Sequence, residues 1–521
     1  MPYQLQSRRK EIKMKKALLI ILAVFLCGCS QKTVQNETEV QEQEAPAGEP
    51  APTVVYDVPV SIPGTLIDQN GYRTGAEKAV IFKGEELPDV FQVYNLETNE
   101  LEYTGQLRSE SSYGDGESTK IGYFTDLVED GQYYIYSDEM GSSYSFRIQN
   151  DLYDDIFNKA CKTYYLNRCG TNLTEELAGA DAHLACHTAE AHLQEDPSRT
   201  LDVTGGWHLN SHADRDVVLG CNIAQNLLMA YEMNANALTD DTGIPESGNG
   251  IPDILDEIRY EIEWLMKMQD ERSGGVYGSA VTVTDNTRDL MQAQVEVTPV
   301  TMEATIHFAM LLADFGYQYQ SFDADFATAC LKSADRAYSL YVKNENATES
   351  THAFHAAAEL YRATGSTTYE QVLTAFFNKT DFDTLFNEDE DVFLGSVTYI
   401  STSQKVNVSV CDNIMKLLMK KASSIASASK NSNFMVSSED QTQILDDMRT
   451  ITITDHIIYN YEYTTIIENH AHYLMGRNPQ AVNYITDDTE RTYLDTDEGT
   501  GIMNQPLLNA KFIFMLSVIK E

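Results

Sequence analysis

Four residues that commonly bind metals lie close together in the sequence, between positions 169 and 208. They are Cys169, Cys186, His187 and His208. Two thiolates and two imidazoles suit tetrahedral Zn²⁺, whose borderline softness favours sulfur and nitrogen donors. With four protein ligands the ion would have no open coordination position, so we expect it to hold loops together and not to activate water. The alternative interpretation is a pair of buried thiols beside unrelated histidines.

A second group of residues that could do chemistry lies in the segment around His208. The segment 202–216 reads Asp-Val-Thr-Gly-Gly-Trp-His-Leu-Asn-Ser-His-Ala-Asp-Arg-Asp. It contains three titratable side chains, His212, Asp214 and Asp216, of which the histidine ordinarily titrates near neutral pH. The two aspartates directly precede an apolar run that starts at Val217, so they are equally suited to be solvated charges at a helix start.

A third group consists of oxygen donors of the kind that Ca²⁺ binds. The residues are Glu246, Asn249, Asp253, Asp256 and Glu257. Their spacing matches no established ligand pattern, so capping or solvated roles are favoured and calcium is kept as the alternative.

The N-terminal residues have the pattern of an export signal. Met14-Lys15-Lys16 precedes an apolar run over residues 17–26, which is too short to span a bilayer but suits a signal-peptide core. Leu26-Cys27-Gly28-Cys29-Ser30 resembles the bacterial lipobox, with Cys29 as the lipid-accepting residue. The sequence therefore predicts a signal peptide over residues 1–29 and an extracytoplasmic lipoprotein held at the bacterial cell surface by its acyl chains alone. A cleaved secretory signal with an incidental cysteine is the alternative.

Composition limits the choice of partner. The chain has 521 residues and a formal net charge of −42, which argues against nucleic acid or an anionic membrane surface as a ligand. A neutral polysaccharide is compatible with this charge, and so is a purely solubilising role.

The remaining chain divides into three parts by pattern. Residues 30–57 are rich in Pro, Glu and Gln and predict a disordered tether. Residues 58–149 contain short β-type runs separated by turn residues, which indicate a β-sandwich. Residues 150–521 show repeated amphipathic helical patterns, for example over 251–266, and Gly365 is expected to end a helix.

Several longer motifs, spread in order over nearly the whole chain after residue 60, resemble those of family 9 glycoside hydrolases, the cellulase family. They include Asp68-Gln69-Asn70-Gly71-Tyr72, the segments 164–170, 202–216, 244–257 and 356–365, and Tyr473-Leu474-Met475-Gly476-Arg477-Asn478-Pro479. The resemblance implies an N-terminal immunoglobulin-like β-sandwich followed by an all-α (α/α)6 barrel. It also implies that Cys169, Cys186, His187 and His208 bind a structural zinc ion.

The resemblance implies roles for further residues. Segment 497–506 keeps a Glu, an Asn and a Pro at the family's intervals, so Glu498 matches the general acid of an inverting hydrolase of β-1,4-glucans. The two aspartates expected after the tryptophan are replaced by Leu209 and His212. Asp214, Asp216 and His212 remain as candidate substitute bases, and Trp207 and Arg491 as candidate substrate-binding residues.

Two functions follow from this combination. The first is a surface lipoprotein that hydrolyses a β-1,4-glucan-type polysaccharide, with activity impaired by the missing base. The alternative is a non-catalytic relative of the cellulases that binds glycan or serves as a structural component.

Overall fold

The computed structural model describes residues 55–284, 290–485 and 501–520. The predicted signal peptide, Cys29 and nearly all of the predicted tether lie outside the described residues, so those predictions are untested. Within the described part of the chain, no helix combines the length and the apolar character needed to cross a membrane.

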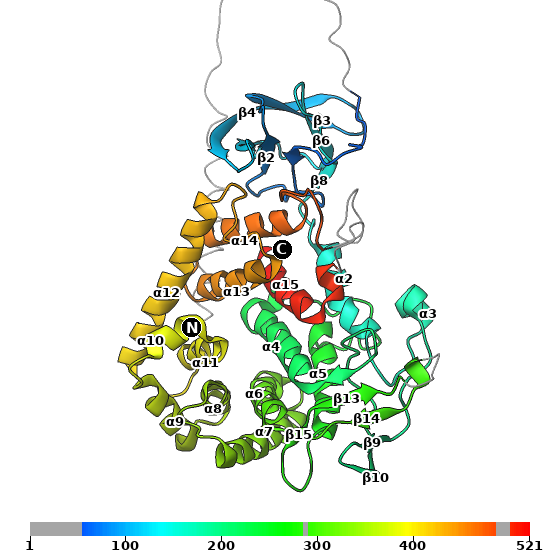
Figure 1. Cartoon of the computed structure of the whole chain (residues 1–521), viewed down its shortest axis with the longest axis vertical. Coiled ribbons are helices and arrows are strands. Elements are labelled where there is room, and N and C mark those ends of the chain that lie inside the picture. The colour runs from blue at the N-terminus through cyan, green and yellow to red at the C-terminus, as the bar shows by residue number, and fades with distance from the viewer. Residues whose placement is uncertain (1–54, 285–289, 486–500, 521) are drawn as a thin grey trace, which may run out of the picture. The chain divides into compact units, whose positions relative to one another are not determined.

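The N-terminal domain is a β-sandwich (Figure 1). Its antiparallel strands follow the order β1-β2-β5-β4-β3-β6-β7, and β8 pairs with β6. The long strand β4 pairs with β3 through its first half and with β5 through its second half, so it links the two sheets. The strands are β1 (Thr65–Leu66), β2 (Ala79–Gly84), β3 (Val90–Asn95), β4 (Leu101–Ser112), β5 (Ser118–Tyr123), β6 (Gly131–Ser137), β7 (Gly141–Ser142) and β8 (Phe146–Ile148).

The helical domain is an (α/α)6 barrel whose inner ring is visible in Figure 1. The inner helices are α4 (Val217–Asn234), α6 (Met302–Gln318), α8 (Thr351–Thr364), α11 (Glu390–Ser401), α13 (Gln441–Ile457) and α15 (Pro506–Ile519). Consecutive members pack side by side from α4 to α11, and α15 closes the ring between α13 and α4. A salt bridge of 2.6 Å between Arg449 on α13 and Glu390 on α11 joins the remaining pair.

An outer helix precedes each inner one along the chain, which completes the paired arrangement. The outer helices are α2 (Asp154–Leu166), α5 (Asp253–Lys267), α7 (Ala324–Asn344), α9 (Thr367–Phe377) with α10 (Phe382–Glu388), α12 (Val408–Asn431) and α14 (Tyr461–Leu474). Inner helices such as α6 are apolar on nearly every face because they are covered on all sides, whereas α5 is amphipathic and leaves one face in water. The predicted fold class is therefore confirmed.

Individual helix ends follow the sequence signals. Gly365 adopts a left-handed backbone with φ of 65° after α8 and donates its N–H to the carbonyl oxygen of Tyr361 at 2.8 Å, as the predicted helix stop requires. Near the C-terminus the chain breaks between two helices, because α13 ends at Ile457 and α14 begins at Tyr461.

The prediction of a purely helical second domain missed a small sheet beside the barrel. Strands pair there in the order β10-β9-β14-β13-β11, and a separate pair forms from β12 and β15. Periodicity failed to find them because each is only two to six residues long. They are β9 (Ala191–Leu193), β10 (Asp196–Leu201), β11 (Arg215–Asp216), β12 (Val276–Tyr277), β13 (Ser279–Thr282), β14 (Val295–Val297) and β15 (Val300–Thr301).

The sandwich and the barrel belong to one compact unit, and the Asp68–Tyr72 motif joins them. Asp68 Oδ2 lies 2.7 Å from Nδ1 of the α14 residue His472, and Gln69 Nε2 donates to the carbonyl oxygen of Ala481 at 2.8 Å. Burial raises the pKa of Asp68 and lowers the pKa of His472. Burial therefore favours a neutral hydrogen-bonded pair at this junction over an ion pair.

The boundaries predicted at residues 57/58 and 149/150 remain predictions; β1 begins at Thr65, β8 ends at Ile148 and α2 begins at Asp154.

Candidate active site

The four predicted metal ligands converge on one buried point. One ligand atom from each of Cys169, Cys186, His187 and His208 lies within 4.8 Å of the other three, and all four residues are buried. Among the described residues, this is the one group of three or more such side chains close enough to share an ion.

Short backbone pairings hold two of the four ligands in place. Cys169 N donates to the carbonyl oxygen of Gly206 at 2.8 Å, and His208 N donates to that of Asn167 at 2.8 Å. The end of α2 is thus paired with the segment that leads into α4. His187 has a left-handed backbone with φ of 46°, an uncommon conformation for a residue with a side chain, and its N–H donates to the carbonyl oxygen of Met291 at 3.1 Å.

The distances within this Cys2His2 cluster fit a tetrahedral zinc ion. Zn–S bonds of about 2.3 Å and Zn–N bonds of about 2.0–2.1 Å place tetrahedral ligands about 3.3–3.8 Å apart. The Sγ atoms of Cys169 and Cys186 are 3.8 Å apart, Cys169 Sγ lies 3.5 Å from His187 Nδ1, and Cys186 Sγ lies 3.6 Å from His208 Nε2. The hydrogen bond from Cys169 lowers the pKa of the Cys186 thiol, and burial lowers the pKa of His208. A thiolate and neutral imidazoles are the forms that ligate zinc.

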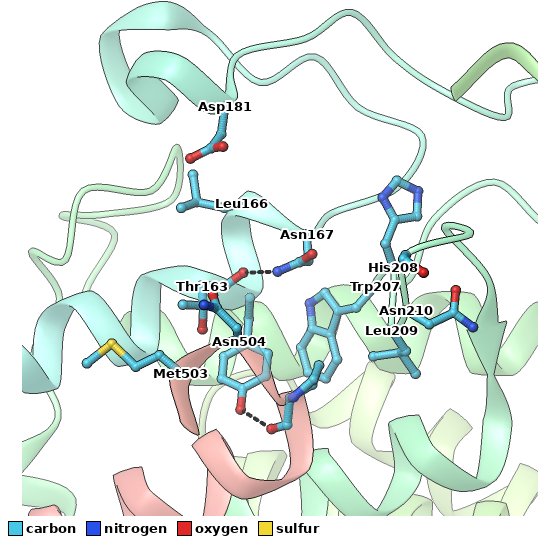
Figure 2. A pocket seen from close by; sticks show the side chains of 13 residues that line it. Thr163, Leu166, Asn167, Asp181, Trp207, His208, Leu209, Asn210, Met503 and Asn504 are labelled. Atoms are coloured by element: carbon cyan, nitrogen blue, oxygen red, sulfur yellow. Dashed lines mark hydrogen bonds between the residues drawn. The ribbon is translucent and has the colours of Figure 1, made fainter. Parts of the chain in front are cut away.

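A pocket of about 350 Å³ lies directly beside this cluster (Figure 2). The end of α2, the segment 207–211 and the start of α15 form its walls. The lining residues are Thr163, Tyr164, Leu166, Asn167, Asp181, Trp207, His208, Leu209, Asn210, Ser211, Met503, Asn504 and Pro506. Two segments that the sequence analysis singled out, 202–216 and 497–506, therefore meet at one site although nearly 300 residues separate them.

Trp207 forms one wall of the pocket and is fully buried. Its indole ring packs against Tyr164 with ring centroids 5.0 Å apart, and its backbone N–H donates to Glu261 Oε2 at 2.8 Å. Burial raises the pKa of Glu261 to about 8. The role of Trp207 in binding substrate stays a prediction, while the packing of its ring explains why a tryptophan suits this position.

The candidate substitute bases do not line the pocket. His212 is exposed, and Asp214 accepts hydrogen bonds from Thr282 N at 2.7 Å and Asn210 Nδ2 at 3.0 Å. Asp216 caps α4 by accepting from Leu219 N at 2.9 Å, and its second oxygen accepts from Ser279 Oγ at 2.8 Å. Both aspartates thus serve local structure, and their role as bases stays a prediction.

Asp181 was not considered in the sequence analysis, yet it is the one carboxylate among the described residues that line the pocket. It belongs to a short 3₁₀ turn, Gly179–Asp181, and is exposed. Figure 2 shows it above Leu166, on the far side of the pocket from Leu209. No sequence signal distinguishes this aspartate from others on the surface, because the chain has to fold before the turn reaches the pocket.

The oxygen donors proposed for Ca²⁺ are engaged with protein groups. Arg168 forms salt bridges with Glu246 and Glu257, both at 2.9 Å, and Asp256 accepts from Asn249 Nδ2 at 3.0 Å. Asp253 Oδ2 accepts from Ser247 Oγ at 2.8 Å. The calcium prediction gains no support from this arrangement.

Glu498 and Arg491 lie outside the described residues, although Met503, Asn504 and Pro506, which follow Glu498, line the pocket.

Comparison with known protein families decides the identity of the fold. A family model described as glycosyl hydrolase family 9 matches residues 153–495, more than half of the chain, and one described as cellulase N-terminal ig-like domain matches residues 63–142. The chain belongs to glycosyl hydrolase family 9. Within this family 9 chain, the first match covers the barrel from α2 to α14 and the second covers most of the sandwich.

Relatives of this family 9 protein include enzymes named for different substrates. It is 26% identical over 424 residues to the cellodextrinase of Butyrivibrio fibrisolvens. The aligned region covers 73% of this chain and 76% of that enzyme. It is 27% identical over 369 residues to endoglucanase D of Acetivibrio thermocellus, covering 65% of the chain. The identity to a xyloglucan-specific endo-β-1,4-glucanase of Bacteroides ovatus is 23% over 350 residues, covering 58% of the chain. The chain spans 58% of the length of each of the latter two enzymes.

Solved structures of family 9 proteins share the fold. A metagenome-derived family 9 endoglucanase superposes with a TM-score of 0.77 at 21% identity, covering 88% of this chain and 98% of that one. A Zn-binding triple mutant of a family 9 endoglucanase superposes with a TM-score of 0.74 at 22% identity, covering 86% and 99%. These likenesses support the (α/α)6 architecture with its preceding sandwich.

Proposed function

We propose that this family 9 protein binds a β-1,4-glucan-type polysaccharide in the pocket beside Trp207 and hydrolyses it far more slowly than a family 9 enzyme with both carboxylates. One observation carries the proposal. Leu209 lines the pocket where the family pattern has an aspartate, while Asp214 and Asp216 are hydrogen-bonded elsewhere.

The chemistry of inversion explains why Leu209 matters. An inverting glycosidase needs one carboxylic acid to protonate the leaving oxygen and one carboxylate to activate water on the opposite face of the sugar. A leucine side chain cannot accept a proton, and general-base catalysis contributes about 10²- to 10⁴-fold to a rate. We therefore infer that binding is retained while the water-activating half of the mechanism is weakened.

The ligand class follows from the pocket and from the relatives. Asn167, Asn210, Ser211 and Asn504 offer amide and hydroxyl groups that can both donate and accept hydrogen bonds, as a neutral sugar requires. The relatives are named for cellodextrin, glucan and xyloglucan substrates. A β-1,4-glucan or xyloglucan chain is the substrate class that these names share.

We also propose that the Cys2His2 cluster binds one structural zinc ion. Cys169 and Cys186 would supply thiolates and His187 and His208 neutral imidazoles, leaving no coordination position for water. Since His208 and Trp207 are adjacent, the ion would fix the pocket wall.

A second candidate function is residual hydrolysis that uses Asp181. The observation in its favour is that Asp181 lines the same pocket as Asn504, which belongs to the segment that carries Glu498. In this version Glu498 is the general acid and Asp181 orients the water.

Binding and turnover distinguish the two functions. Cellotetraose and xyloglucan oligosaccharides are titrated calorimetrically into the purified protein, and reducing ends are measured over long incubations. Binding with slow turnover that Asp181→Asn leaves unchanged, or with no turnover above that of Glu498→Gln, supports the first function. Turnover that both Glu498→Gln and Asp181→Asn abolish supports the second, and absence of both binding and turnover rejects the two together.

We further propose that the protein is an extracytoplasmic bacterial lipoprotein anchored through Cys29. The support is the lipobox-like segment 26–30 after a short apolar run. Metabolic labelling with an alkyne fatty acid should label the wild-type protein and leave Cys29→Ser unlabelled. Equal labelling of both would reject the anchor.

A further inference from the structure

A second hollow, larger than the pocket beside Trp207, lies between the sandwich and the barrel. It has a volume of about 530 Å³, within the range of roughly 300–1,000 Å³ typical of small-molecule sites. Strands β4 and β5 form one wall, and the other consists of the end of α12, the following loop and α14. We call it the junction groove.

Hydrogen bonds fix the two walls of the junction groove against each other. Asn433 Nδ2 donates to the carbonyl oxygen of Ser112 at 3.0 Å, and Tyr113 Oη donates to Glu439 Oε2 at 3.3 Å. The ring of Tyr113 also meets Phe434 edge-on, with centroids 5.0 Å apart. Because these contacts hold the domains together beside the groove, its shape is built into the fold.

The lining is rich in neutral polar side chains. Serine, threonine and asparagine predominate, namely Ser109, Ser111, Thr119, Ser429, Asn431, Ser432, Asn433, Thr465 and Asn469. Each hydroxyl or amide can donate or accept a hydrogen bond. The charges nearly cancel, because Lys430 and Glu462 form a salt bridge and Glu77 alone remains. Such a surface suits a neutral ligand with many hydroxyl groups better than a charged peptide.

Two features point to a built site. Tyr123 is 40% exposed, and a tyrosine ring combines apolar faces with a polar edge, the combination on which sugar rings stack. Ser109 and Met435, on opposite walls, have left-handed backbones with φ of 59° and 61°. Such conformations are uncommon outside glycine and gather at ligand sites.

Asn469 is held in one orientation at the bottom of this site. Its Oδ1 accepts from the buried Arg477 Nη2 at 2.7 Å, and its backbone oxygen accepts from the same nitrogen at 3.1 Å. Fixing the oxygen also fixes the amide nitrogen, which makes no hydrogen bond to another residue within the described part of the chain and is not fully buried. That nitrogen is left to donate to a ligand.

We propose that the junction groove is a second carbohydrate-binding site, which takes a neutral oligosaccharide with Tyr123 as stacking platform and Asn469 as hydrogen-bond donor. This proposal does not depend on hydrolysis in the pocket beside Trp207. Its effect would be to hold a polysaccharide against the junction between the sandwich and the barrel.

The test must separate the junction groove from the pocket. Ser211→Trp fills the pocket and serves as the background for titrations of the full-length protein with cellotetraose, xylotetraose, mannotetraose and a xyloglucan heptasaccharide. At least one of these should still bind saturably. Tyr123→Ala should then weaken this binding about tenfold or more, and Asn431→Trp, which replaces an exposed side chain at the rim, should block it.

Tyr459→Ala is the matched control, because Tyr459 is 75% exposed and does not line the groove. It should leave the affinity unchanged. Binding of none of the four probes, or binding that neither Tyr123→Ala nor Asn431→Trp alters, would overturn the proposal. Loss of turnover in the Ser211→Trp background reports on the pocket alone and leaves this test intact.

Discussion

The side chain of Asp216 accepts a hydrogen bond from the backbone N–H of Leu219 at 2.9 Å, and this contact caps the first turn of the inner helix α4. Its other oxygen accepts from Ser279 on β13, which ties the helix start to the small sheet. A carboxylate with both oxygens occupied in this way is a structural residue and a poor candidate for activating water at the pocket.

Substitution at Asp216 separates these two roles. Asp216→Asn keeps a capping oxygen, whereas Asp216→Ala removes it and should lower the free energy of unfolding by about 1 kcal/mol, as for other lost N-caps. We expect Asp216→Asn to bind and turn over cellotetraose as the wild type does. If it abolishes measurable turnover while its unfolding curve is unchanged, Asp216 is a base after all.

The zinc prediction is tested by metal analysis. We expect about one zinc ion per chain in the wild type, none in Cys186→Ser, and a lower Tm for the wild type after dialysis against a chelator, because ion binding stabilises the folded state. Cys411→Ser is the matched control, since Cys411 is a half-buried thiol outside the cluster. Unchanged zinc content in Cys186→Ser would refute the site.

Glu261 should make stability depend on pH. Burial raises its pKa from 4.5 to about 8 in the folded protein, so the folded state retains a proton that the unfolded state loses. Stability therefore falls as pH rises through the window from about 4.5 to 8. Glu261→Gln keeps an acceptor for Trp207 N without this penalty, so its stability relative to wild type should improve by roughly 2–4 kcal/mol between pH 5 and 8.5. Denaturant unfolding at both pH values measures this, and a pH-independent difference would contradict it.

Arg362 lies among three carboxylates of the inner helices α4, α6 and α8, of which Asp314 and Glu359 are buried. Its guanidinium lies 2.7 Å from Asp314 and Glu232 and 2.6 Å from Glu359. Burial raises the pKa of Asp314 to about 7. Arg362→Met should cost about 3–5 kcal/mol in the free energy of unfolding, because it leaves buried charges unpaired.

Lys332→Met, at an exposed position on α7, is the control for that change and should stay within about 0.5 kcal/mol of wild type. Chemical denaturation compares the two. Similar small effects of the two substitutions would show that the salt bridges of Arg362 contribute little to the free energy of unfolding.

The sequence predicted the fold and the grouping of two cysteines and two histidines because their signals are local or come in long motifs. Apolar residues recur along α5 at helical spacing, and Cys169, Cys186, His187 and His208 are types with few other reasons to occur together. A place for Asp216 at a helix start was one of the predicted alternatives, but its capping hydrogen bond was not predicted, since a helix start gives no direction for the side chain.

Other features depend on contacts between distant parts of the chain. Asp181 reaches the pocket through a turn that no periodicity marks, and β9 pairs with β14 about 100 residues away. The junction groove likewise needs Tyr123 and Asn469, which are 346 positions apart, to face one hollow. Only tertiary packing brings such residues together.

The proposed function requires that the pocket beside Trp207 binds glucan but lacks the residue that activates water. The most direct measurement is the rate of cellotetraose hydrolysis by the wild type and by the double variant Leu209→Asp/His212→Asp, which restores the family pattern. We expect little or no turnover by the wild type and a gain of at least about 100-fold in the double variant, abolished by adding Glu498→Gln. Rapid hydrolysis by the wild type, with no gain in the double variant, would contradict it.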